Sequence, residues 1–151
     1  MMSDKAVDGS TQKIDHLGIA VPSLEEGIRT YEVLLGTEVA HIEEVIDQRV
    51  KTAFFQVGES AIELLEATDD QSPIARFLSK NPRGGLHHVC ITVEDIEASL
   101  ARYREAGVRL IDSTPRRGAH NKWVAFVHPV STGGVLLELS QDGPLTSERQ
   151  R

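Results

Sequence analysis

Cysteine, aromatic residues and long apolar runs are scarce in this chain, and each shortage excludes a class of protein. Cys90 is the only cysteine among 151 residues, so no intrachain disulfide can form and a disulfide-stapled secreted domain is excluded. No run approaches the roughly 18 apolar residues that a membrane helix needs, and residues 1–13 are too polar for a signal peptide. We therefore expect a cytoplasmic protein in which Cys90 is buried as a small apolar side chain.

Basic residues are also in the minority. The chain has 16 Lys and Arg against 23 Asp and Glu, with a formal net charge of −7. This balance argues against a nucleic-acid partner, because phosphates are neutralised by clustered Lys and Arg. Hydrophobic residues make up 40% of the chain and charged residues 26%, which is close to the globular average. The length fits one compact domain or two half-size modules that share a core.

The feature that stands out is an internal repeat. The segment from Ile14 and the segment from Leu86 match at a constant offset, and apolar positions between the matches keep their character. The identical pairs are His16 and His88, Ile19 and Ile91, Val21 and Val93, Glu25 and Glu97, and Tyr31 and Tyr103. The repeat predicts two modules with the same fold.

Each half starts with a strand of alternating pattern, at 14–21 and 86–93, followed by an amphipathic helix. Ser23 and Asp95 are the expected N-caps, and both helices end near a glycine, Gly36 or Gly107. Further strands are expected at 38–45, 50–57, 61–65, 109–112, 123–127 and 135–139. Ser72 and Pro73 open a short helix between the halves.

These elements predict an α+β fold of two tandem βαβββ modules. The first module covers residues 13–80 and the second 86–141, joined by a linker at 81–85. The ends, residues 1–12 and 142–151, are polar and are expected to be frayed tails.

Alternation along the strands places four polar side chains on one face. In the strand at 14–21 the helix must cover Leu17 and Ile19, so His16 points to the opposite face, beside small residues that leave space. The second half repeats this for His88, and puts His87 on the other side of the strand. The same reasoning applied to the last strand of each half brings Glu63 and Glu138 to the histidine face.

A carboxylate flanked by leucines is costly to bury unless it is neutralised, paired or bound to a metal. A single strand histidine is usually structural, and a single buried glutamate usually meets Arg or Lys. Two imidazoles and two carboxylates in equivalent positions instead favour one divalent ion, held by His16, Glu63, His88 and Glu138. His/Glu sites accept cobalt, manganese, nickel or zinc according to supply, so the sequence leaves the ion open.

The motifs IDHLGIAV, DQRVKTAFF, IELLEATDDQSPIARFL, GLHHV, GAHNKWVAFVHP and GVLLEL resemble the methylmalonyl-CoA epimerase family of the vicinal oxygen chelate, or glyoxalase, superfamily. The resemblance covers about residues 14–140. It implies a curved eight-stranded mixed sheet around a metal site, one metal per chain, an acyl-CoA thioester substrate and a homodimer. It also implies ligand roles for the same four residues that the repeat selects.

The resemblance implies interconversion of (R)- and (S)-methylmalonyl-CoA, by removal and return of the C2 proton through a metal-stabilised enolate. Some family members carry a glutamate base where this chain has Thr52, which cannot serve as a base. Glu63 and Glu138 are therefore the expected pair of catalytic carboxylates on opposite faces of the substrate, with Glu43, Glu44 and His120 in reserve.

The substrate-binding candidates are cationic and polar loop residues. Arg116, Arg117 and Lys122 lie in a loop that could meet coenzyme A phosphates, and His120 is in the same loop. Gln48 could hold the substrate carboxylate. His41 and His128 have no counterpart in the repeat and are expected at the surface or in turns.

Three other functions share this pattern. A glyoxalase-type isomerase would use the same four ligands on a glutathione hemithioacetal. A ring-cleaving dioxygenase would need two histidines and one glutamate for iron(II), which leaves Glu63 superfluous. A non-catalytic protein that sequesters small molecules would need none of the four residues together.

Overall fold

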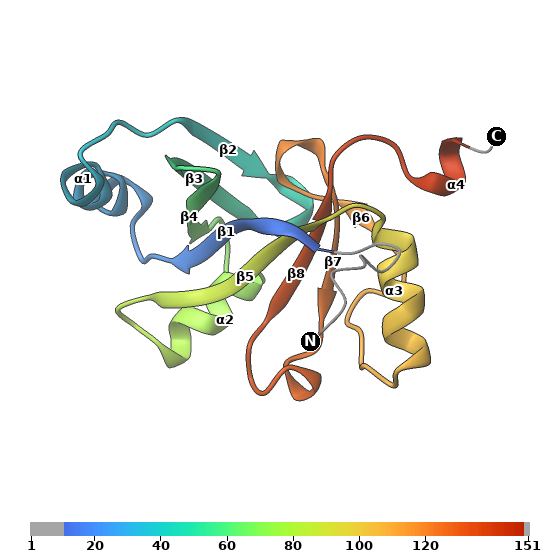
Figure 1. Cartoon of the computed structure of the whole chain (residues 1–151). Coiled ribbons are helices and arrows are strands. Elements are labelled where there is room, and N and C mark those ends of the chain that lie inside the picture. The colour runs from blue at the N-terminus through green and yellow to red at the C-terminus, as the bar shows by residue number, and fades with distance from the viewer. Residues whose placement is uncertain (1–10, 150–151) are drawn as a thin grey trace, which may run out of the picture. The chain divides into compact units, whose positions relative to one another are not determined.

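The computed structural model describes residues 11–149, which form two compact units (Figure 1). The first unit is Asp15–Val89, and the second comprises residues 90–149 together with 11–14. The described strands have the order β2-β3-β4-β1-β5-β8-β7-β6 in one eight-stranded mixed sheet. Both β1 and β5 cross the boundary and contribute residues to each unit. The prediction of two tandem βαβββ modules is confirmed.

In the first unit, β1 is parallel to β4, whereas β4 with β3 and β3 with β2 are antiparallel. The elements are β1 (Thr11–Ala20), α1 (Leu24–Leu35), β2 (His41–Val45), η1 (Ile46–Gln48), β3 (Val50–Val57), β4 (Ser60–Ala67) and α2 (Pro73–Lys80). The predicted strand at 50–57 has the bounds of β3, and the predicted short helix opened by proline is α2.

The residues predicted to begin and end the helices of the first unit make capping interactions. The side chain of Ser23 accepts a hydrogen bond from the backbone N–H of Glu26, and α1 ends at Gly36, whose φ of 67° lies in the left-handed region. The side chain of Ser72 accepts from the backbone N–H of Ile74, one residue after Pro73 starts α2. Local sequence thus sets where these helices begin and where α1 ends.

The two faces of the first-unit sheet are covered by different helices. Helix α1 packs on one face, in a cluster of Val21, Leu24, Ala53, Phe55 and Leu64. Helix α2 packs on the other, in a cluster of Ala20, Val50, Leu65 and Ile74. Because alternate residues of a strand share a face, the face that α2 covers at Ala20 continues to Gly18 and His16. The histidine face is therefore opposite α1, as predicted.

The second unit repeats the register of the first. Its elements are β5 (Gly85–Val93), α3 (Ile96–Glu105), β6 (Arg116–Arg117), η2 (Ala119–Asn121), β7 (Trp123–Val127), η3 (Pro129–Ser131), β8 (Leu137–Gln141) and α4 (Thr146–Arg149). Phe126 of β7 lies opposite Glu138 of β8, just as Phe54 of β3 lies opposite Glu63 of β4. The two carboxylates therefore occupy equivalent places in the two units.

Helix α3 is capped by Asp95, whose side chain accepts from the backbone N–H of Ala98. It packs on β7 and β8 in a core cluster of Val93, Ile96, Leu100, Ala125, Leu139 and Leu145. Cys90 is fully buried, as predicted. In the described residues no helix is both long enough and apolar enough to cross a membrane.

The predicted strand at 109–112 is wrong. Leu110 makes an isolated bridge to Val127, and the edge strand that pairs with β7 is Arg116–Arg117 instead. The reason is Asp112, whose carboxylate accepts the backbone N–H of Phe126 at 2.8 Å. A side chain thus takes the place that a strand carbonyl would occupy in the ladder.

The predicted frayed tails are wrong where the structure describes them. Thr11 and Gln12 belong to β1. At the other end Leu145 is only 8% exposed and joins the α3 core, and the hydroxyl of Thr146 donates to the carboxylate of Asp95 at 2.8 Å. The burial of Leu145 and the hydrogen bond of Thr146 hold the C-terminal segment against α3. The remaining tail residues, 1–10 and 150–151, lie outside the described part of the chain.

Candidate metal and active site

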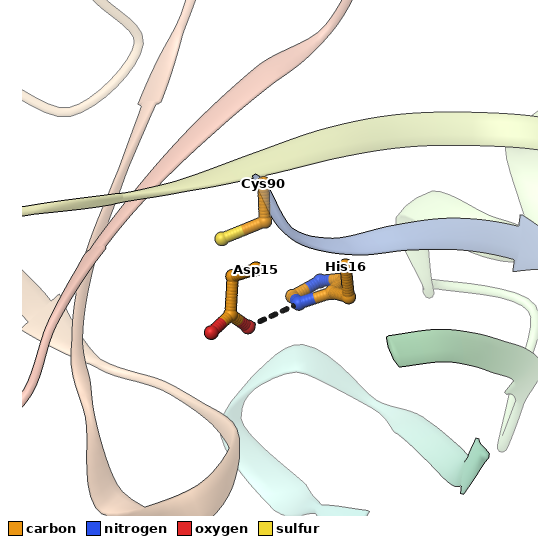
Figure 2. Close-up of side chains that lie close together, drawn as sticks. All are labelled: Asp15, His16 and Cys90. Carbon is orange, nitrogen blue, oxygen red and sulfur yellow. Dashed lines mark hydrogen bonds and ion pairs between the residues drawn. The ribbon is translucent and has the colours of Figure 1, made fainter. Parts of the chain in front are cut away.

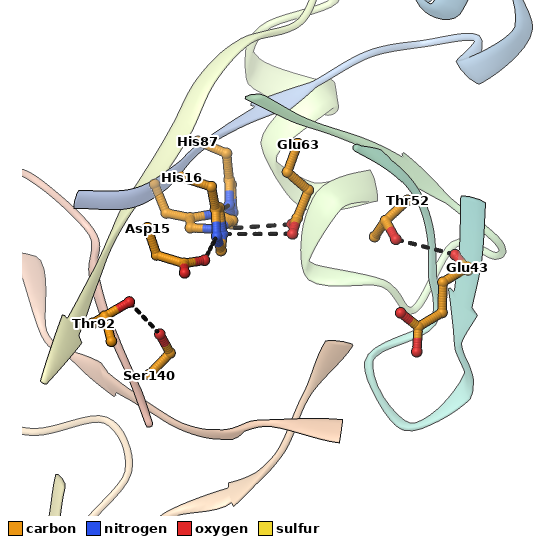
Figure 3. A network of polar contacts seen from close by, with 9 residues as sticks. Asp15, His16, Glu43, Thr52, Glu63, His87, Thr92 and Ser140 are labelled. Atoms are coloured by element: carbon orange, nitrogen blue, oxygen red, sulfur yellow. Dashed lines mark hydrogen bonds and ion pairs between the residues drawn. The ribbon is translucent and has the colours of Figure 1, made fainter. Parts of the chain in front are cut away.

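Three of the four predicted ligands, His16, Glu63 and His88, converge in the first unit. Figure 3 shows the side chains of His16 and Glu63 pointing toward one another. Nε2 of His16 lies 3.0 Å from Nε2 of His88. The carboxylate of Glu63 lies beside both rings, with Oε2 3.5 Å from Nε2 of His16 and Oε1 3.9 Å from Nε2 of His88. The three residues are 5–6% exposed, so their polar atoms are shielded from water.

Strand pairing explains why these side chains meet. Gly18 of β1 lies opposite Glu63 of β4 in the parallel ladder, and His16 shares the face of Gly18. An added Cβ at Gly18 would lie only 2.2–2.6 Å from atoms of the His88 imidazole. Because Gly18 has no side chain, the His88 ring can pack directly against the backbone of β1.

Each histidine has a hydrogen-bond partner on its second ring nitrogen. Nδ1 of His16 lies 2.8 Å from a carboxylate oxygen of Asp15, a contact marked by the dashed line in Figure 2. Nδ1 of His88 lies 2.9 Å from Nδ1 of His87. The sequence places His87 on the far side of the strand, yet its ring reaches the ring of His88. This expectation is therefore wrong, because the long imidazole side chains allow neighbouring rings to meet at right angles, here 89°.

The donor set fits a divalent cation. Nδ1 of His16 donates its proton to Asp15, so Nε2 of the neutral His16 ring carries a lone pair. This lone pair faces the imidazole of His88 and the carboxylate of Glu63. Lone pairs at 3.0 Å repel unless a proton or cation lies between them. Two nitrogen or oxygen ligands of one ion, each at about 2.0–2.1 Å, can be at most about 4.2 Å apart. The separations of 3.0, 3.5 and 3.9 Å all satisfy this limit.

The fourth predicted ligand, Glu138, is in the second unit. It lies on β8, is 7% exposed, and faces Phe126 across the ladder. Nearby on the same strand the hydroxyl of Ser140 lies 3.5 Å from that of Thr92. Burial of a glutamate on a central strand sets the same requirement for a positive partner as at Glu63.

Thr52 is buried at 1% exposure, and its hydroxyl donates to the backbone carbonyl of Glu43 at 3.2 Å. Glu43 lies directly opposite Thr52 in the β2-β3 ladder, so both share a face with Phe54 and Glu63. The Glu43 carboxylate is 3.4 Å from Nε2 of His41. Glu44 is exposed.

The predicted substrate-binding residues are partly or fully exposed, and lie in η1 and in the segment from β6 to Lys122. Arg116 pairs with Asp112 at 3.1 Å, and Lys122 with Asp142 at 3.5 Å. Arg117 instead lies 4.0 Å above the ring of Trp123 and donates to the carbonyl of Asn121. Two further candidates lie in short 3₁₀ helices, Gln48 half-buried in η1 and His120 exposed in η2.

Comparison with known proteins agrees with this geometry. Residues 15–126 match the Glyoxalase/Bleomycin resistance protein/Dioxygenase superfamily. The ethylmalonyl-CoA/methylmalonyl-CoA epimerase of Cereibacter sphaeroides is 45% identical over 130 residues, which cover 85% of this chain and 97% of the relative. The crystal structure of methylmalonyl-CoA epimerase from Mycobacterium tuberculosis has a TM-score of 0.83 and 37% identity, covering 95% of this chain and 94% of that one.

The chain belongs to the methylmalonyl-CoA epimerase family. A Streptomyces coelicolor methylmalonyl-CoA epimerase, solved in complex with 2-nitronate-propionyl-CoA, has a TM-score of 0.85 at 34% identity, covering 90% of this chain and 98% of that one. The resemblance noted from the motifs is thus confirmed.

Sequence reasoning missed three residues that lie against the ring of His16 or His88: Asp15, Gly18 and His87. The signal that could have found two of them is their place directly before each repeated histidine. Gly18 could be predicted only as a small residue, because its contact with His88 depends on how the strands pair.

Proposed function

We propose that this chain interconverts (R)- and (S)-methylmalonyl-CoA by moving the proton at C2, with one divalent ion held by His16, Glu63, His88 and Glu138. The observation that carries the proposal is the buried carboxylate of Glu63 beside two facing imidazoles, in a member of the epimerase family. Two relatives that match over most of their length, from Dictyostelium discoideum and Cereibacter sphaeroides, are named as methylmalonyl-CoA epimerases.

The ion would be held by residues from both halves of the repeat. His16, Glu63 and His88 converge in the first unit. Glu138 occupies the equivalent place to Glu63 in the second unit, which supports a matching role. When bound, a divalent ion supplies Lewis acidity that stabilises negative charge on the thioester oxygen of the substrate.

The chain's own carboxylates would move the proton. Glu63 accepts the C2 proton, and the electron pair of the broken C–H bond delocalises into the thioester to give an enolate. Glu138, in its acid form, returns a proton to the opposite face, which inverts the configuration at C2. The reverse reaction exchanges the two roles, and solvent resets both carboxyl groups afterwards. Glu63 and Glu138 lie opposite equivalent phenylalanines in the two halves of the repeat, which supports matched roles for the two carboxylates.

Burial serves this chemistry in two ways. Exposures of 5% at Glu63 and 7% at Glu138 keep bulk water from competing for the carboxylates. Electrostatic interactions with the developing enolate charge are also stronger in a site from which water is excluded. A carboxylate is a weak base in water, and desolvation makes it a stronger one.

The test is deuterium exchange at C2 with each pure enantiomer in D₂O. Glu63→Gln should lose exchange from one enantiomer selectively, and Glu138→Gln from the other, while Glu25→Gln serves as a control because Glu25 is an exposed carboxylate of α1. Full activity of Glu63→Gln with both enantiomers would remove Glu63 from the mechanism. Elemental analysis of the same preparations should find one divalent ion per chain.

Two further features belong to the proposal, a homodimer and a cytoplasmic location. Light scattering on the purified protein should give twice the 16.6 kDa mass of the chain. A monomeric mass at working concentration contradicts the dimer without affecting the proposed reaction.

A further inference from the structure

We infer that Asp15 and His87, the residues directly before the two metal-binding histidines, are positioning residues that fix which ring nitrogen of each histidine faces the metal site. The inference deepens the proposed function, because it assumes that His16 and His88 bind the ion through Nε2. It assigns the same task to two positions that are 72 residues apart, the separation of His16 from His88.

Asp15 determines the tautomer of His16. A carboxylate can only accept a hydrogen bond, so in the 2.8 Å contact the proton must be on Nδ1 of His16. The Nε2 atom of a neutral ring then carries the lone pair, and this atom faces Nε2 of His88 and the Glu63 carboxylate. The side chain of Asp15 is only 14% exposed, so water competes little for the bond.

His87 performs the equivalent task for His88, with a neutral ring in place of a carboxylate. Their Nδ1 atoms are 2.9 Å apart, so one must donate and the other accept. If Nε2 of His88 is a metal ligand, its proton lies on Nδ1 and His87 accepts. The ring of His87 is held for this by edge-on contact with Phe77 of α2, with 5.2 Å between ring centroids and 85° between planes.

The two partners differ in charge, which predicts unequal effects. A carboxylate partner orients the ring and also raises its basicity as a ligand, whereas a neutral imidazole mainly orients it. Loss of such partners weakens metal binding by about 10–100-fold in known sites. We therefore expect Asp15→Ala to fall near the upper end of this range and His87→Phe near the lower end.

The first experiment measures zinc affinity of the full chain by competition with a chelating dye. Asp15→Ala and His87→Phe should weaken binding, while Asp15→Asn and His87→Gln, which keep an acceptor, should recover part of the loss. Asp69→Ala is a matched control at a more exposed position of the same unit and should bind zinc as the parent does. Thermal unfolding of the metal-free variants verifies that each one folds.

The second experiment observes the tautomers directly, by ¹⁵N NMR of the histidine rings in metal-free protein, with signals assigned from His16→Ala and His88→Ala. In the metal-free parent, His16 should carry its proton on Nδ1, and the proton between the two Nε2 atoms should then be on His88. Asp15→Ala should shift His16 toward the other tautomer. Unchanged tautomers, or zinc affinities equal to the parent, would overturn the inference. Failure of the parent itself to bind zinc would instead contradict the proposed metal site, and the NMR result would stand apart from it.

Discussion

Gly18→Ala adds a single methyl group at the point where β1 meets the ring of His88, and its effect can be worked out from the structure. An added Cβ would be 2.2 Å from Cε1, 2.4 Å from Nδ1 and 2.6 Å from Nε2 of His88. Ordinary contact needs at least 3.4 Å, so the imidazole must move by more than 1 Å. Gly18 does not have a positive φ, so the backbone itself tolerates alanine.

Two free-energy terms oppose each other in this variant. Alanine in place of glycine in a strand stabilises the fold by about 0.5–1 kcal/mol through lower chain entropy. Overpacking against a buried ring costs about 1–3 kcal/mol. We expect a net loss of stability of about 1–2 kcal/mol, and a larger loss of function. A displacement of about 1 Å at a preorganised site costs on the order of 100-fold in rate.

The assay is urea unfolding of the metal-free protein, combined with zinc affinity and epimerase activity. A double-mutant cycle with His88→Ala isolates the contact, because truncation of the ring removes the clash. In the His88→Ala background, Gly18→Ala should be neutral or stabilising. The coupling free energy should be about 1–3 kcal/mol.

Gly27→Ala in α1 is the matched control, since its added Cβ would approach Leu64 no closer than 3.2 Å and the helix gains from alanine. It should retain parental zinc affinity and activity. The reasoning is refuted if Gly18→Ala destabilises the protein as much without the His88 ring as with it. The same holds if Gly18→Ala binds zinc like the parent.

Two further predictions concern the core and the substrate. Leu64→Ala removes a fully buried side chain from the α1 core and should cost about 2–5 kcal/mol in urea unfolding. The same change at Leu34, which is 68% exposed, should stay within about 0.5 kcal/mol, and equal losses would contradict the assigned core. Arg117→Ala should raise KM for acyl-CoA several-fold with little change in kcat, because its charge meets a ring and a carbonyl rather than a carboxylate. Arg116→Ala should change KM less, since Asp112 already pairs with it, and the reverse order in steady-state kinetics would count against Arg117 as a phosphate contact.

Alternation along the strands and helix-capping residues were sufficient to predict most of the helices and strands. The strands at 50–57 and 123–127 and the short helix opened by Pro73 agree with the structure because each is defined by local signals, a period of two or a proline at the first turn. The segment 109–112 failed because a backbone N–H of β7 is satisfied by the Asp112 side chain, a contact that no local pattern indicates. Leu145 was missed for a similar reason, since a single leucine in a polar tail gives no periodic signal.

The sequence by itself determined the duplication and the common face of His16 and His88, because identical residues at a constant offset occupy equivalent positions. Its motifs also indicated the family by resemblance. Only the tertiary structure decided which neighbours act on those residues. The contact of Gly18 with the ring of His88 and the approach of His87 to that same ring depend on strand pairing and on packing against α2. Such distances are set by side chains far apart in the chain, and no pattern along it records them.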